Sequence, residues 1–167
     1  MRIFLSLLER IEGLVATVAY VIVAVLLIGD IVAREILGIP LLGTQAIAVL
    51  AAIVAGFVGL SLATAAGSHL RPEAFDKVLP RRFDSYLERA SDLVAAAFYV
   101  AIACFAILFV TESRAAGDRI AVLFFPLWPV QLVMPIAFLS CAIRHFFFAI
   151  DPKLKSRSQP GQQFAEG

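Results

Sequence analysis

The sequence predicts an all-α integral membrane protein, with four transmembrane helices and amphipathic interfacial arm helices. Of its 167 residues, 61% are hydrophobic and 16% are charged, against about 25% charged in an ordinary soluble domain. The mean hydropathy is +0.91. The charged residues fall in blocks, and the stretches between these blocks approach or exceed the roughly 20 helical residues that cross a hydrocarbon core of about 30 Å. Four stretches lack Asp, Glu, Lys and Arg: 13–29, 36–70, 93–111 and 120–143.

The four stretches are apolar on every side, which favours helices over the strands of a membrane barrel. Barrel strands alternate apolar and polar residues, whereas a helix satisfies its own backbone hydrogen bonds in lipid. We expect a single domain over 1–150 without an internal repeat, and a flexible cytoplasmic tail at 151–167. The predicted spans are about 13–36, 43–67, 91–112 and 126–148.

Two further segments have the pattern of helices that lie on the membrane surface. In the segment 2–12, apolar residues recur at helical spacing and Glu12 falls on the polar side with Glu9 and Arg10. The segment 73–90 repeats the pattern around Pro80 and predicts an interfacial helix broken by proline. The alternative for the second segment is a solvated loop.

The basic residues predict the orientation. With the N-terminus in the cytoplasm, 11 of the 14 Lys and Arg residues lie on the cytoplasmic side and three lie outside. Positive residues accumulate on the cytoplasmic side of membrane proteins. We therefore expect a multi-pass protein with both termini in the cytoplasm.

Ionisable residues near the spans suggest neither catalysis nor ion binding. Asp30 is either an i, i+4 partner of Arg34 or an ion site, and the spacing favours the ion pair. His69 and His145 fall at the inner ends of spans, where they do not face one another as haem ligands would. Cys104 and Cys141 stand singly and suggest buried thiols. We expect no catalytic residue, metal or cofactor.

The second span carries small residues at every fourth position, a pattern that lets helix backbones approach closely in lipid. This row serves either packing within the four helices or contact with another subunit, and the sequence leaves both open. The row consists of Ala51, Ala55, Gly59, Ala63 and Gly67, and beside it lie Ala48, Ala52 and Gly56.

Short motifs along the chain resemble the DctQ family, the small membrane subunit of TRAP transporters. The resemblance covers about residues 10–148 and departs at Gln45, where the family usually has glutamate. The motifs are 34–40 (REILGIP), 43–45 (GTQ), 57–59 (FVG), Ser68-His69, Leu79-Pro80, 125–128 (FPLW) and Pro135. The matching positions include Gly38, Gln45, Gly59, His69, Pro80, Trp128 and Pro135.

The resemblance implies a component of the bacterial inner membrane that is not an enzyme. A periplasmic binding protein would capture an organic acid such as a dicarboxylate, and a large DctM-type permease would import it by symport with sodium. The small subunit would scaffold the large one and help to dock the binding protein. Candidate docking residues on the periplasmic side are Arg34, Glu35, Arg114, Asp118 and Arg119.

Other classes of membrane protein compete with this interpretation. A small multidrug exporter requires an acidic residue deep in the first helix, and the run 13–29 has none. A membrane enzyme requires a nucleophile, an acid–base pair or metal ligands on one face, and the sequence offers only scattered Ser and Thr. A stand-alone membrane assembly or scaffold protein without a transport role fits nearly as well on physical grounds.

Overall fold

The computed structural model describes residues 2–65, 84–120 and 123–151. Their regular structure is helical, apart from an isolated antiparallel bridge between Arg119 and Pro126. The helices are α1 (Arg2–Leu37), α2 (Thr44–Ala65), α4 (Asp84–Ala116), α5 (Trp128–Gln131) and α6 (Val133–Ile150).

Four helical segments of the described chain are long and apolar enough to cross a membrane, as the sequence predicts. Large apolar side chains such as Val21, Phe105 and Ile136 are exposed on their outer faces. Contiguous apolar surface of this extent is unusual on a soluble monomer and natural in contact with lipid. The segments are Ile3–Leu37, Thr44–Ala65, Arg89–Ala116 and Trp128–Ile150.

The first helix differs from the expected arm followed by a span. α1 runs for 36 residues without a break, about 54 Å at about 1.5 Å per residue, so the segment 2–12 is helical but continuous with the first span. No proline interrupts it, and Glu12 does not lie on a solvated polar face, because its side chain is only 12% exposed and contacts α6. Because α6 supplies partners for the Glu12 carboxylate, this side chain does not have to lie on a solvated surface.

The second predicted arm falls largely outside the described residues. Positions 73–83, including Pro80, are not described, and residues 84–90 form the first turns of α4. The helix α4 therefore begins before the predicted span 91–112, and its candidate spanning segment is Arg89–Ala116. The predicted tail also lies outside the described residues, except for Asp151.

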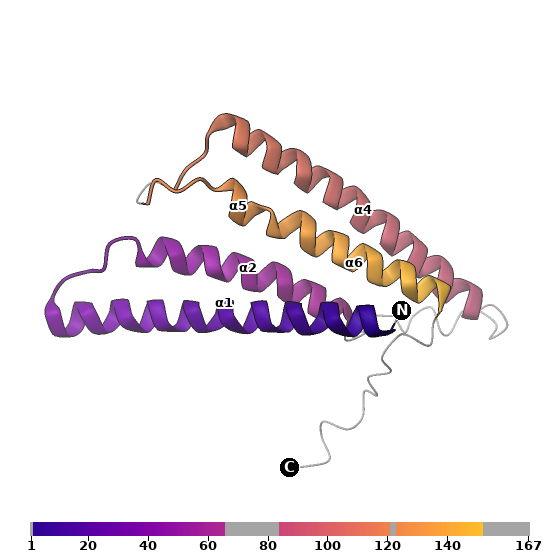
Figure 1. Ribbon diagram of the computed structural model, residues 1–167, viewed down its shortest axis with the longest axis horizontal. Helices are drawn as coiled ribbons and strands as arrows, with labels where there is room; N and C mark the ends of the chain where they lie inside the picture. The colour runs from indigo at the N-terminus through magenta and orange to yellow at the C-terminus, as the bar shows by residue number, and fades with distance from the viewer. Residues whose placement is uncertain (1, 66–83, 121–122, 152–167) are drawn as a thin grey trace, which may run out of the picture.

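The helices form two hairpins. The first hairpin is α1 packed against α2, the second is α4 packed against α6, and contacts between α2 and α6 join them. Figure 1 shows the hairpins converging toward the end where the N-terminus lies and diverging toward their loops. We call these the closed end and the open end.

Glycines in left-handed conformations end α1 and α4 at the open end. Gly38 has φ +69°, and its N–H donates to the Arg34 carbonyl (3.1 Å). Gly117 has φ +71° and, with Asp118, donates to the last carbonyls of α4 in a Schellman arrangement. Left-handed backbone is the conformation that glycine adopts at low cost, so both helices end where a glycine follows.

The fourth span is divided, where the sequence suggested one helix. α5 and α6 are separated at Leu132, between Pro129 and Pro135. Proline lacks an N–H, so Pro135 cannot donate to the carbonyl of residue 131, four positions earlier. The loss of this bond accompanies the break.

Candidate functional site

The small residues of α2 are divided between internal contacts and open surface. Ala48 and Ala55 are buried inside the chain. A methyl group built on Gly56 or Gly59 would meet nothing within 4 Å, and Ala63 is exposed. Part of the row therefore packs within the subunit, while another part has room for lipid or a partner. Of the remaining positions, Ala51 is half-buried, Ala52 is exposed and Gly67 lies outside the described residues.

The five candidate docking residues are exposed near the open end: Arg34 and Glu35 in the last turn of α1, Arg114 in the last turn of α4, and Asp118 and Arg119 in the loop that follows α4. Two of them already have partners within the chain. Arg34 forms an ion pair with Asp30 (2.6 Å), and the Arg114 guanidinium lies 5.1 Å from the centroid of the Trp128 ring. The Arg114 contact places the end of α4 beside the start of α5.

Asp30 closes the turn between α1 and α2, in agreement with the ion-pair interpretation. One carboxylate oxygen accepts from Arg34 and the other from the backbone N–H of Leu41 (3.1 Å). The Gln45 side chain lies beside the same carboxylate. Asp30 is therefore engaged in holding the first loop.

A buried polar cluster at the closed end, which we call the Glu12 cluster, is the main feature missed by sequence reasoning. It contains Glu12 of α1, Ser61 of α2, and Ser140 and Arg144 of α6. Arg144 is 2% exposed and pairs with Glu12. Ser140 donates to Glu12 Oε1 (2.5 Å), and the Ser61 hydroxyl lies 2.8 Å from the same oxygen and 2.9 Å from Ser140 Oγ. The cluster thus joins three helices from both hairpins.

One turn further along α2, the contact between the hairpins continues. Thr64 Oγ1 lies 3.4 Å from the Cys141 sulfur, and it also donates to the Leu60 carbonyl (3.1 Å). Cys141 is buried, as expected from the sequence, whereas Cys104 is exposed on α4. Cys104 therefore presents its thiol outward, contrary to the expected burial.

A second buried polar pair lies within the second hairpin. His145 Nδ1 is 3.1 Å from Asp92 Oδ1, and both residues are buried. The imidazole stacks on Tyr99, with centroids 5.5 Å apart and an interplanar angle of 18°, and meets Phe148 edge-on. This pair ties α4 to α6 next to the Glu12 cluster, because Arg144 and His145 are neighbours.

The positions of these charges explain how a membrane protein tolerates them. Glu12 directly precedes the charge-free run 13–29, Asp92 precedes 93–111, and Arg144 follows 120–143. All three therefore flank the charge-free runs of the spans and lie outside them, and a charge near the bilayer centre is costly. A buried charge without a partner is strongly destabilising, so the pairing explains their burial inside the bundle.

The sequence did contain a signal for the cluster. Ser61 and Thr64 on α2, and Ser140 and Arg144 on α6, fall three or four positions apart, so each pair shares a helix face. Glu12 was instead assigned to the polar side of an arm on the membrane surface, and its pairing with Arg144 was not predicted.

The chemistry of the Glu12 cluster is that of a structural tie. The carboxylate accepts hydrogen bonds from a guanidinium and two hydroxyls. Among the described residues, no group of three or more His, Cys, Asp and Glu side chains could hold a metal ion. Its geometry favours holding helices together.

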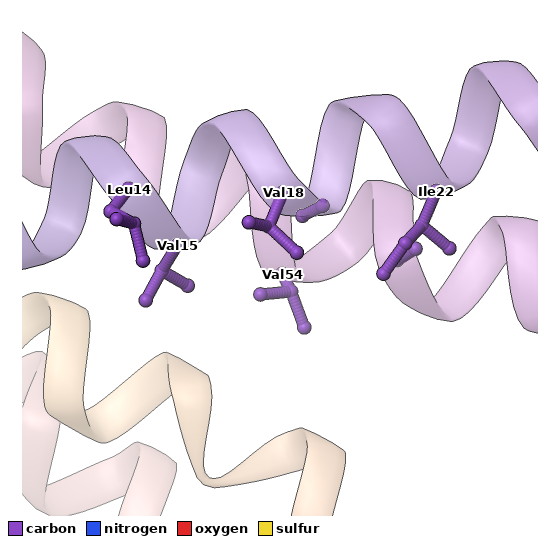
Figure 2. A pocket seen from close by; sticks show the side chains of 7 residues that line it. Leu14, Val15, Val18, Ile22 and Val54 are labelled. Atoms are coloured by element: carbon purple, nitrogen blue, oxygen red, sulfur yellow. The ribbon is translucent and has the colours of Figure 1, made fainter.

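An apolar groove of about 280 Å³ lies between α1 and α2 of the first hairpin. Figure 2 shows Val15, Val18 and Ile22 of α1 and Val54 of α2 pointing into the same space. Its other lining residues are Leu14, Ala19 and Ala51. The lining has no polar side chain with which to bind a carboxylate or a cation.

A family model described as the DctQ component of tripartite ATP-independent periplasmic transporters matches residues 22–151. The chain belongs to the DctQ family. No curated protein matches it significantly. The matched region includes Ser61, Asp92, Ser140, Arg144 and His145, whereas Glu12 precedes it. This DctQ protein is thus a small, multi-pass membrane component of a tripartite transporter. The DctQ family is a family of transport components and not of enzymes.

Proposed function

We propose that this DctQ protein is the scaffolding subunit of a sodium-driven importer of an organic acid. It steadies a large DctM-type permease, which performs translocation, and helps a periplasmic solute-binding protein to dock. The family match over 22–151 carries the proposal. Sodium coupling and a carboxylate substrate are the features that the resemblance to TRAP transporters implies.

The interior of the chain supports an accessory role. Secondary transporters commonly bind substrate and coupling ion near the bilayer midplane, among broken helices and polar groups. Here the groove of the first hairpin is apolar, and the ionisable groups inside the bundle pair with one another as Glu12–Arg144 and Asp92–His145. The break in the fourth span lies near Trp128 at the open end, away from the middle of the helices.

We further propose that the protein lies in the inner membrane with its closed end toward the cytoplasm. The bias of 11 basic residues against three supports this orientation. Cysteines introduced at Leu42 and Asp118 in a Cys104→Ala background should react with an impermeant maleimide from outside. Cysteines at Lys77 and Ser156 should react only after permeabilisation, and external labelling of Lys77→Cys would refute the orientation.

Reconstitution into liposomes tests the proposed function. With an inward sodium gradient and the binding protein outside, a panel of labelled carboxylates should accumulate only when both membrane subunits are present. Accumulation with this chain and the binding protein alone would overturn the accessory role. Full activity of the large subunit without this chain would overturn the scaffolding role.

A further inference from the structure

The loop between α4 and α5 is a tightly bonded turn. The Ile120 N–H donates to the Phe125 carbonyl (3.0 Å), and the Phe124 N–H donates to the Ile120 carbonyl (2.8 Å). At the base of the turn, the Leu127 N–H donates to the Asp118 carbonyl (3.0 Å). These bonds join the described residues on the two sides of positions 121–122.

The tip places large apolar side chains outward at a conformational cost. Phe124 has φ +52°, in the left-handed region that bulky residues rarely occupy. Its side chain nevertheless points away from the protein, with 72% of the residue exposed, and Phe125 beside it is 49% exposed. Backbone strain of this kind persists where surrounding bonds impose it, and it often marks a functional position.

The surroundings of the tip indicate what it contacts. Positions 120–127 (IAVLFFPL) contain no charged and no polar side chain. Trp128 follows this run in the sequence, and its ring lies against Arg114. Trp is enriched at the interface between lipid and water. The other loop of the open end also exposes Ile39, Leu41 and Leu42.

We propose that Leu123, Phe124 and Phe125 insert into the interfacial layer of the bilayer at the open end. All three residues are apolar and exposed, like the outer faces of the spans. The base of the same turn, with exposed Asp118 and Arg119, is assigned to water, whereas the run 120–127 at the tip has no polar side chain. Insertion fixes the depth of the second hairpin, and the proposal does not depend on the transported substrate or on the proposed orientation.

Spin labelling of the full chain in phosphatidylcholine nanodiscs tests the proposal. In a Cys104→Ala background, single cysteines replace Phe124 or Phe125 at the tip. Asp118→Cys, at the exposed base of the turn, is the aqueous control, and Phe105→Cys, on the exposed face of α4, is the lipid control. The two tip positions check one another if one variant folds poorly.

Relaxation of the labels by oxygen, which concentrates in lipid, is compared with relaxation by a water-soluble nickel complex. We expect both tip labels, like the Phe105→Cys label, to be relaxed more by oxygen than by nickel. The ratio of nickel to oxygen relaxation should be about tenfold higher for the Asp118→Cys label, since polar reagents are excluded from apolar layers. Tip labels that match the Asp118→Cys label would overturn the proposal. Tip labels shielded from both reagents once the large subunit is added would place the tip in a protein interface and would also overturn it.

Discussion

Arg144 of α6 forms a buried ion pair with Glu12 of α1, 132 positions earlier in the chain. This pair joins the first and last spans at the closed end. Ser61 and Ser140 share the same carboxylate, so α2 is bound at the same point. The two hairpins are thus fastened at one end, while their open ends diverge.

Removing one partner of this pair should strongly destabilise the fold. Glu12→Ala leaves the Arg144 guanidinium buried without its counter-ion, and loss of one member of a buried pair costs about 3–5 kcal/mol. Thermal unfolding in detergent, followed by circular dichroism, should show a large fall in the midpoint. Glu9→Ala, at an exposed position one turn earlier, is the matched control.

A double variant separates charge from packing at this site. Glu12→Gln with Arg144→Met removes both charges, and we expect it to recover much of the lost stability, because a buried pair is often replaceable by neutral groups. Equal stability of Glu12→Ala and Glu9→Ala would contradict a structural role for the pair.

The Asp92–His145 contact should contribute to stability through its hydrogen bond. Asp92→Ala removes a buried partner of the imidazole and should cost about 1–3 kcal/mol. Asp92→Asn keeps an oxygen that can accept from Nδ1 and should cost less. Chemical unfolding of the two variants checks the order, and an Asn variant as unstable as the Ala variant would point to the charge instead.

The open part of the α2 row should serve contact with the large subunit. Because a side chain at Gly59 has room within the chain, Gly59→Leu should change the stability of the isolated subunit by no more than about 0.5 kcal/mol. It should nevertheless reduce co-purification with the large subunit, since bulk prevents close helix approach.

Ala55→Leu is the internal counterpart, because Ala55 is buried within the chain. It should destabilise the isolated subunit by about 1–3 kcal/mol through overpacking. Wild-type recovery of the complex with Gly59→Leu and Ala63→Leu would mean that this face contacts lipid.

Charge reversal at the open end should weaken docking of the binding protein. Arg119→Glu is a cleaner test than Arg114→Glu, because Arg114 also holds Trp128. Rim charges mainly affect the rate of association, so uptake should fall at low binding-protein concentration and recover partly at high concentration. An unchanged concentration dependence would indicate that docking uses the large subunit alone.

The sequence revealed the spans because lipid imposes a simple rule, the exclusion of charge, which can be read along a single segment. The Glu12 cluster depends on which faces of α1, α2 and α6 meet, and this information is distributed over residues up to 132 positions apart. The burial of Glu12 against α6 likewise depends on a residue far along the chain, Arg144. The division of the fourth span at Leu132 required the backbone geometry.

The separation of Glu12 and Arg144 along the chain also bears on biogenesis. A ribosome makes the Glu12 carboxylate with the first helix, and its counter-ion emerges only with the last. Until α6 is inserted, the first hairpin holds an acidic group at the membrane boundary without its guanidinium. A product that stops before α6 therefore differs from the finished subunit in leaving the Glu12 carboxylate without its buried counter-ion.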